Sequence, residues 1–244
     1  MIGEEHPVMR PGRLTAAWLG SVDYATAWAA QGELFEARRS GTAGDCLMLL
    51  EHPHTYTLGR RTRPEDVIYD AAERAARSIA TFEVDRGGRS TYHGPGQLVG
   101  YPIIELEDRY DAIGYLRRLE EVVIRTANDL GVEAHRDRAT GVWVGARKLA
   151  AIGVKVTRGV TMHGFALNVT TDLEMFRGIV PCGLEGRWVT SIEQETGRAH
   201  STREVAGIAA KHFGAVFNRV VAWTDGRELA PCLSAAGVVE PSLS

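Results

Sequence analysis

The segment between Arg86 and Gly100 constrains the fold of this chain more than any other. It reads Arg-Gly-Gly-Arg-Ser-Thr-Tyr-His-Gly-Pro-Gly-Gln-Leu-Val-Gly, with five glycines among its fifteen residues. Glycine lets the backbone turn sharply and approach a ligand, because it has no Cβ. Strand-like apolar runs at 79–84 and 98–106 flank this stretch, so we expect a loop carried on a sheet. A tight hairpin would explain the glycines alone, but not the Arg, Tyr and His placed among them.

The remaining sequence predicts an α/β chain. Apolar periodicity indicates helices over 24–39, 113–130, 172–177 and 203–220, and strands over 46–50, 56–59, 141–144, 149–156 and 160–169. The strands from 141 onward are joined by turns at 145–148 and 157–159. The helix over 113–130 should bury Ile113, Leu116, Leu119, Val123, Ala127 and Leu130 and end at Gly131. Without repeats or linkers, we expect a loose N-terminus (1–14), one domain (15–224) and a partly mobile tail (225–244).

Composition excludes several classes of protein. The formal net charge of −3 provides no general attraction for nucleic acid. No apolar run reaches the roughly 20 residues of a membrane span, and the first twelve residues lack the apolar core of a signal peptide. The three cysteines are widely spaced and odd in number, which argues against a disulfide framework. We therefore expect a cytoplasmic protein that binds neither nucleic acid nor membranes.

Cys182 is a candidate nucleophile. It lies between Pro181 and Gly183, which favour a bend that projects the thiol. A free thiol has a pKa of about 8.5, so it needs a nearby cation to react at neutral pH. The alternative is a small buried core residue. A core position is the better interpretation for Cys46 and Cys232. For Cys182, a nucleophile and a core residue both remain open.

Lys148, His93 and His163 are further candidates for chemistry. Lys148 enters an apolar strand, where a lysine can lose its proton and act as a base, although most lysines at strand ends are solvated. Each histidine is equally compatible with a structural role. No spacing of a metal site, phosphate-binding loop or GxSxG nucleophile turn is present, so we predict no metal.

Four ordered motifs resemble those of the lipoyl(octanoyl) transferases. They are Arg86-Gly-Gly-Arg-Ser-Thr-Tyr-His-Gly-Pro-Gly-Gln97, Arg147-Lys-Leu-Ala-Ala-Ile-Gly153, His163-Gly-Phe-Ala-Leu-Asn168 and Ile179-Val-Pro-Cys-Gly-Leu184. The segment Glu51-His-Pro-His-Thr-Tyr-Thr-Leu-Gly59 also matches that family. The resemblance extends over residues 15–220.

This resemblance implies a fold and a reaction. The fold would be α/β (α+β), with a mixed sheet and packed helices as in biotin and lipoate protein ligases. The enzyme would move an octanoyl group from octanoyl–acyl carrier protein to a lysine of lipoyl domains, the first step of protein lipoylation. The acceptors would be the lipoyl domains of 2-oxoacid dehydrogenase complexes and the glycine cleavage H protein. We expect no cofactor, and we expect a monomer.

The resemblance also implies the site residues. Cys182 would be the nucleophile and Lys148 its partner, acting through a thioester acyl-enzyme, with His163 in support. The substrate contacts would be Arg86, Gly87, Gly88, Arg89, Ser90, Thr91, Tyr92, His93, Ala151, Ile152, Gly153, Gly164, Phe165 and Ala166.

Two other functions are compatible with such a scaffold. One is an ATP-dependent lipoate or biotin ligase, which makes an acyl-adenylate and does not need Cys182. The other is a non-catalytic acyl-binding module, for which neither Cys182 nor Lys148 would matter. The basic run Arg60-Arg61-Thr-Arg63 suits an acidic donor protein, and it is equally compatible with a solvated loop.

Overall fold

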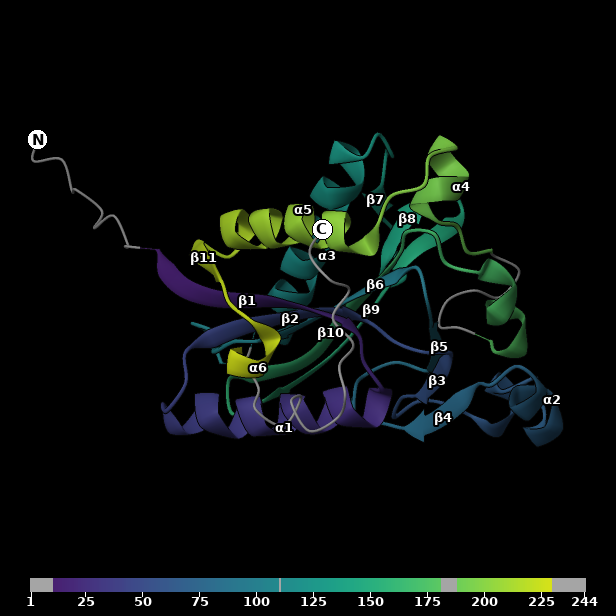
Figure 1. The fold of residues 1–244 in the computed structure, drawn as a ribbon, viewed down its shortest axis with the longest axis horizontal. Coiled ribbons are helices and arrows are strands. Elements are labelled where there is room, and N and C mark those ends of the chain that lie inside the picture. Colours follow the sequence, from purple (N-terminus) through teal and green to yellow (C-terminus); the bar gives the residue numbers. More distant parts are fainter. Residues whose placement is uncertain (1–10, 110, 181–187, 230–244) are drawn as a thin grey trace, which may run out of the picture.

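The computed structural model describes residues 11–109, 111–180 and 188–229, which build a large and a small β-sheet (Figure 1). The large sheet has the strand order β11-β1-β2-β6-β10-β9-β8-β7. Its strands are β1 (Gly12–Ser21), β2 (Asp45–Glu51), β6 (Gln97–Ile103), β7 (His135–Arg136), β8 (Val142–Val144), β9 (Arg147–Thr157), β10 (Val160–Asn168) and β11 (Arg219–Trp223). The small sheet has the order β4-β3-β5, with β3 (Thr55–Leu58), β4 (Ala80–Glu83) and β5 (Ser90–His93).

Helices cover both faces of the large sheet (Figure 1). The α-helices are α1 (Tyr24–Ser40), α2 (Ala71–Ala76), α3 (Ala112–Asp129), α4 (Ile192–Thr196), α5 (Thr202–Val216) and α6 (Gly226–Leu229), and two 3₁₀ helices are η1 (Pro64–Asp66) and η2 (Leu173–Gly178). Helices α3 and α5 lie on one face and α1 on the other. No helix in the described ranges is long and apolar enough to cross a membrane.

The alternation of side chains along the strands divides the core between these faces. In β2, Leu47 and Leu49 pack toward α3 and α5, whereas Met48 and Leu50 pack toward α1. All four side chains are fully buried. Successive side chains of a strand point to opposite faces, so an uninterrupted apolar run is what a strand covered on both faces requires.

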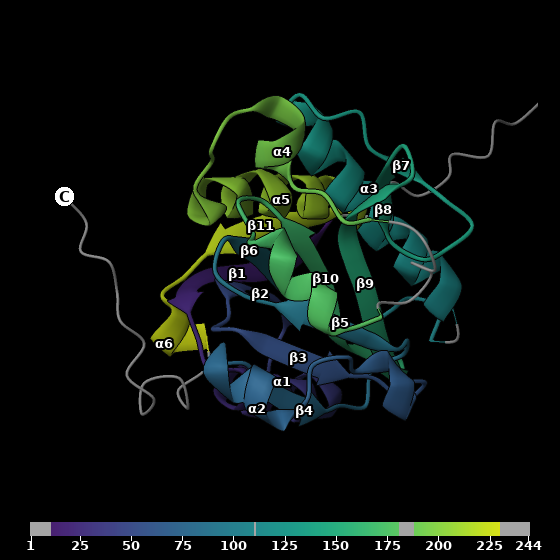
Figure 2. The ribbon, with the colours of Figure 1, turned by 90° about the vertical axis from the view of Figure 1, so that its right-hand side faces the viewer.

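The sheets are mixed in direction. Strand β1 pairs in parallel with β2 and β11, whereas the ladder from β2 through β6, β10, β9 and β8 to β7 is antiparallel. In the small sheet, β3 pairs in parallel with β4 and antiparallel with β5. Figures 1 and 2 place the small sheet beside the part of the large sheet that contains β9 and β10. The predicted mixed α/β architecture is confirmed.

Most predicted elements are confirmed, with local corrections. The segment 86–100 is not one loop, because β-prone residues 90–93 form β5 against β3. The helix predicted over 203–220 ends at Val216; Asn218 has φ of 51°, which ends helical geometry, and β11 follows. The helix predicted over 172–177 is the 3₁₀ helix η2. Lys148 belongs to β9, not to the preceding turn.

Two further differences concern exposure and the ends of the chain. Ile113 is 76% exposed, whereas Tyr115 is buried. Two residues are roughly 200° apart around a helix, so the buried stripe is rotated away from Ile113. Strand β1 begins at Gly12, inside the segment expected to be loose, because β2 and β11 pair with it on both sides. Helix α6 lies inside the segment expected as a tail.

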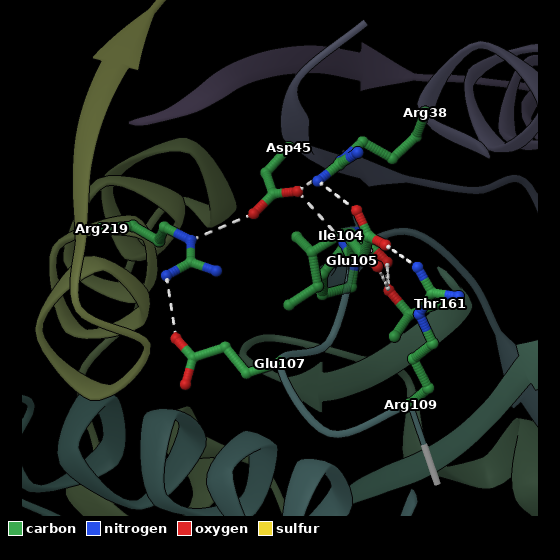
Figure 3. Close-up of polar contacts among 9 residues, drawn as sticks. Arg38, Asp45, Ile104, Glu105, Glu107, Arg109, Thr161 and Arg219 are labelled. Atoms are coloured by element: carbon green, nitrogen blue, oxygen red, sulfur yellow. Dashed lines mark hydrogen bonds and ion pairs between the residues drawn. The ribbon is translucent and has the colours of Figure 1, made fainter. Parts of the chain in front are cut away.

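Asp45 joins three parts of the chain that are distant in sequence (Figure 3). Its Oδ1 accepts hydrogen bonds from Nε of Arg38 at 2.7 Å and from the backbone N–H of Glu105 at 3.1 Å. Its Oδ2 accepts a hydrogen bond from Nε of Arg219 at 3.0 Å. Asp45 is 8% exposed. The carboxylate therefore ties the end of α1 and the start of β11 to the centre of the large sheet.

Replacing Asp45 by Ala should lower the free energy of unfolding by about 2–4 kcal/mol, because two partly buried guanidinium groups and an N–H lose their acceptor. Chemical denaturation measures this. The matched control is Glu36→Ala, which removes the exposed Arg39–Glu36 pair and should cost about 0.5 kcal/mol or less. Equal losses in the two variants would contradict the role given to Asp45.

Candidate active site

A cavity of about 590 Å³ opens between the small sheet and strands β6, β9 and β10 of the large sheet. This volume falls in the range of about 300–1,000 Å³ that is typical of small-molecule sites. Exposed side chains, among them Arg61, Arg63 and Arg138, form its rim. Buried side chains, among them Tyr24 and Tyr101, line the rest of it.

The structure brings nearly all predicted site residues to this cavity. Lining residues include Lys148, His163 and thirteen of the predicted substrate contacts: Arg86, Gly87, Gly88, Arg89, Ser90, Thr91, His93, Ala151, Ile152, Gly153, Gly164, Phe165 and Ala166. Tyr92 does not line it. Side chains alternate along β5, and the ring of Tyr92 packs against Tyr56 and Phe176, with its hydroxyl 2.7 Å from Nδ1 of His54.

The glycine-rich segment closes against the edge of β9. The N–H of Gly87 donates to the carbonyl of Val154 at 3.0 Å. A Cβ at Gly153 would lie 2.9 Å from Cδ of Arg86, which is closer than side chains approach one another. Glycine at this position is therefore required for the close packing of the segment on the strand.

Arg86 places a buried guanidinium in the cavity wall. The residue is 7% exposed, and its Nη2 donates to the carbonyl of Thr57 at 2.8 Å and to Oγ1 of Thr57 at 2.9 Å. Burial lowers the pKa of His93 well below its usual value, and the charges of the nearby His52 and Arg86 lower it further. His93 is therefore a neutral hydrogen-bonding group at neutral pH, not a cation.

Arg89 has a structural partner. Its Nε donates to Oδ2 of Asp66 at 2.8 Å, and its Nη2 pairs with Oδ1 of the same carboxylate. The side chain of Asp66 is fully buried, and its carbonyl accepts a hydrogen bond from the N–H of Val180 at 2.8 Å. Ser90 Oγ donates to the carbonyl of Val180 at 2.9 Å. The glycine-rich segment and Val180 are thus held together by this pair and its neighbours.

Lys148 lies at the other side of the cavity. It is 5% exposed, and its Nζ lies 4.8 Å from the centre of the Trp143 ring. Its N–H donates to the carbonyl of Trp188 at 2.9 Å, and its carbonyl accepts from the N–H of Thr190 at 2.9 Å. Cys182 lies outside the described residues, as does Cys232. The prediction that Cys46 is a core residue is confirmed, and burial raises the pKa of its thiol to about 12.

A chain of hydrogen bonds through Gln97 and Asn168, which line the cavity, connects His93 to the strand of Lys148. His93 Nδ1 lies 2.9 Å from Oε1 of Gln97, whose Nε2 donates to Oδ1 of Asn168 at 2.9 Å. Asn168 Nδ2 donates to the carbonyl of Thr190 at 2.9 Å, and the N–H of Thr190 donates to Lys148. The two sides of the cavity are therefore held at a fixed separation.

Two residues hold His163 by hydrogen bonds, Gln31 and Asp85. His163 has φ of 58° within β10, and its N–H donates to Oε1 of Gln31 at 2.8 Å. Its Nε2 lies 2.8 Å from Oδ1 of Asp85, and Oδ2 of Asp85 lies 2.6 Å from Nζ of Lys155. Burial lowers the pKa of His163 despite the neighbouring carboxylate. The neutral imidazole therefore donates from Nε2 to Asp85.

Sequence reasoning did not select four residues of this arrangement. Gln97 and Asn168 belong to two of the motifs, and each is a polar residue at one end of an apolar strand. This pattern could have indicated a buried polar network. Asp66 and Asp85 carried no such signal, because their partners are distant in sequence. Within the described ranges, no group of three or more His, Cys, Asp and Glu residues could hold a metal ion.

The Arg89–Asp66 pair should make stability depend on pH. The hydrogen bond from Arg89 holds the pKa of Asp66 below its usual value, so the unfolded chain takes up the proton first as the pH falls. The stability from the pair is fully present above the unfolded pKa of about 3.9 and declines below it. Arg89→Ala should cost about 2–4 kcal/mol at pH 6 and clearly less at pH 3. Denaturant unfolding at both values measures this, and an equal cost at both would contradict it.

The chain is similar along most of its length to known octanoyltransferases. It is 52% identical over 204 residues to the octanoyltransferase of Solibacter usitatus, covering 82% of this chain and 91% of that protein. It is 45% identical over 214 residues to that of Koribacter versatilis, covering 85% of each. The octanoyltransferase of Mycobacterium marinum is 50% identical over 203 residues, covering 79% of this chain and 83% of that protein.

Solved structures share the fold at low sequence identity. Lipoate-protein ligase A bound with ATP superposes with a TM-score of 0.74 at 19% identity, covering 93% of both chains. A biotin protein ligase from Aquifex aeolicus superposes with a TM-score of 0.51 at 14% identity, covering 83% of this chain and 70% of that one. The predicted likeness to both kinds of ligase fold is confirmed. The family model "Lipoyl protein ligase A/B catalytic domain" matches residues 23–214. The chain therefore belongs to the lipoyl protein ligase A/B catalytic domain family, as its motifs predicted.

Proposed function

We propose that this enzyme transfers an octanoyl group from octanoyl–acyl carrier protein to a specific lysine of lipoyl domains through a thioester on Cys182. The placement of Lys148 carries this proposal. Its side chain is buried at the cavity, and its backbone pairs with Trp188 and Thr190, which follow the Cys182 segment. Val180, which precedes that segment, is bonded to the glycine-rich side of the cavity. The similarity to octanoyltransferases supports an acyltransferase.

In the first half-reaction, the thiolate of Cys182 attacks the thioester carbonyl of the donor. A new C–S bond forms to Cys182, and the C–S bond to the carrier breaks. The carrier leaves as a thiol after its sulfur takes a proton from the Lys148 ammonium, which leaves Lys148 neutral. One thioester replaces another, which makes the step nearly balanced in energy. An ammonium at Lys148 within about 4–6 Å would favour the thiolate by lowering the pKa of the thiol.

In the second half-reaction, the acceptor lysine must lose a proton before its amine attacks the acyl-enzyme. Lys148 is the proposed base, because a lysine removed from water holds its proton less tightly. A C–N bond forms, the C–S bond breaks, the second proton of the attacking nitrogen passes to solvent, and Cys182 returns as a thiolate. Amide formation makes this step favourable. The cycle is a ping-pong reaction with a covalent intermediate.

The rim of the cavity suits an acidic donor. Arg61, Arg63 and Arg138 are exposed there, and positive charge at a rim accelerates the approach of a negatively charged partner. The proposed acceptors are the lipoyl domains of 2-oxoacid dehydrogenase complexes and the glycine cleavage H protein. A cytoplasmic location fits the proposal, because the thiol must stay reduced.

Brief mixing with octanoyl–acyl carrier protein in the absence of ATP should add one octanoyl group to Cys182. Intact-mass and peptide mass spectrometry detect the adduct, and adding a lipoyl domain should remove it. Cys182→Ser should lose the transfer to the lipoyl domain. Transfer that requires free octanoate and ATP and survives Cys182→Ser would instead identify a ligase.

Lys148→Ala should shift the alkylation of Cys182 to higher pH, since the thiolate loses a neighbouring cation. The rate of iodoacetamide modification at Cys182, followed by peptide mass spectrometry across pH 6–10, measures the shift. Arg147→Ala alters the neighbouring exposed side chain and is the control. An unshifted profile in Lys148→Ala would refute the pairing.

Arg61→Glu combined with Arg63→Glu should raise KM for the donor protein on the order of tenfold at low salt and less at high salt, with kcat little changed. Steady-state kinetics at two ionic strengths measure this. Arg203→Glu, an exposed residue on α5 away from the cavity, is the control. The same KM in the double variant and the wild type would show that the rim arginines do not attract the donor protein.

A further inference from the structure

The strand register gives the cavity a direction. Lys148 and His163 both line the cavity and are 5% and 1% exposed. His163 pairs with Val154, six residues along β9 from Lys148, so the two residues mark opposite ends of the part of this strand that lines the cavity. On the proposed function, an acyl chain enters past Lys148 and runs toward His163.

Strands β9 and β10 border a path whose length matches that of an octanoyl chain. Ala151 pairs with Ala166 and Gly153 with Gly164, and all four residues line the cavity. The side chain of Arg86 packs over Gly153, so the path passes beside Arg86 along Ala151 and Ala166. The next register pair is Val154 with His163. The His163 ring contacts Trp28 and Tyr101, which pack with Ala166 on the side of α1, so the ring lies on the same face as Ala166. Three residues of a strand, from Ala151 to Val154, span about 10 Å. An extended octanoyl chain has seven C–C bonds and spans about 9 Å with tetrahedral geometry. A carbonyl level with Ala151 thus brings the terminal methyl group to His163.

The backbone conformation of His163 is unusual among the residues that line the cavity. A positive φ is uncommon for a residue other than glycine and persists only where the surroundings enforce it. Gln31 holds the backbone N–H, and Asp85, itself paired with Lys155, holds Nε2. The ring lies between Trp28 and Tyr101, with centroid distances of 6.4 and 6.5 Å. The protein therefore fixes a strained polar residue where the acyl pocket ends.

We propose that His163 is a specificity-determining residue that ends the acyl pocket and limits the chain to the octanoyl length. A longer chain would have to displace an imidazole held from Gln31 and Asp85. Its Nδ1 has no hydrogen-bond partner among the described residues, so added methylenes would meet a buried polar atom instead of an apolar surface. Asp85, Lys155 and Gln31 act as positioning residues. This inference rests on the proposed acyl transfer.

Competition between donors tests the proposal. Octanoyl- and decanoyl-acyl carrier protein are mixed in equal amounts with the enzyme, and the ratio of the two adducts is measured by intact mass. Because both donors compete for the same molecules, the ratio does not depend on how much enzyme is folded. His163→Gly suits the positive φ and opens the end of the pocket. Each additional buried methylene then favours binding about fourfold, so the decanoyl-to-octanoyl ratio should rise on the order of tenfold.

Two further variants complete the experiment. His163→Asn also tolerates positive φ and is smaller than His, so its ratio should rise in the same direction. Met162→Ala shortens the neighbouring buried side chain, which does not line the cavity, and should leave the ratio unchanged. A ratio unchanged in both His163 variants, or raised equally by Met162→Ala, overturns the proposal while octanoyl transfer stands. No adduct from either donor in the wild type overturns the proposed function and this inference with it.

Discussion

The cavity depends on how the glycine-rich segment closes against the edge of β9. Strand β8 pairs with β9 only along 147–150, so the rest of this edge is open to another partner. Gly87 occupies it by donating to Val154, and Asp85 bonds to His163 and Lys155 beside it. The interrupted sheet edge thus becomes a wall of the cavity, and the small sheet is held over it.

Polar groups, rather than apolar contacts, fix the two sides of the site relative to one another. The line from His93 through Gln97 and Asn168 to Thr190 ends at the backbone of Lys148. Each member is buried, and a buried polar group without a partner is costly. The separation between the glycine-rich segment and Lys148 is therefore well defined. Lys148 needs such a fixed position if its side chain is to reach the thioester.

The sequence predicted the parts of this arrangement that depend on local pattern. The apolar runs of β2 and β10, the periodicity of α1 and the glycines that flank β5 are readable without a structure. The resemblance of the motifs predicted the family, which the similarity to known octanoyltransferases confirms. The role of Cys182 stays a prediction. The interactions that pattern could not predict join distant segments: Asp45 with Arg219, Asp66 with Arg89, and Asp85 with His163. Such pairs depend on the tertiary arrangement and produce no regular spacing in the sequence that could predict them.

On the proposed function, one acyl chain attached through Cys182 fills the cavity from the side of Lys148 to His163. A crystal structure of the octanoylated enzyme would show where this chain lies. The chain should pass Ala151 and Ala166, with its methyl group at His163 and with Nζ of Lys148 near the thioester. A chain that lies outside the cavity, or a thioester far from Lys148, would refute this placement.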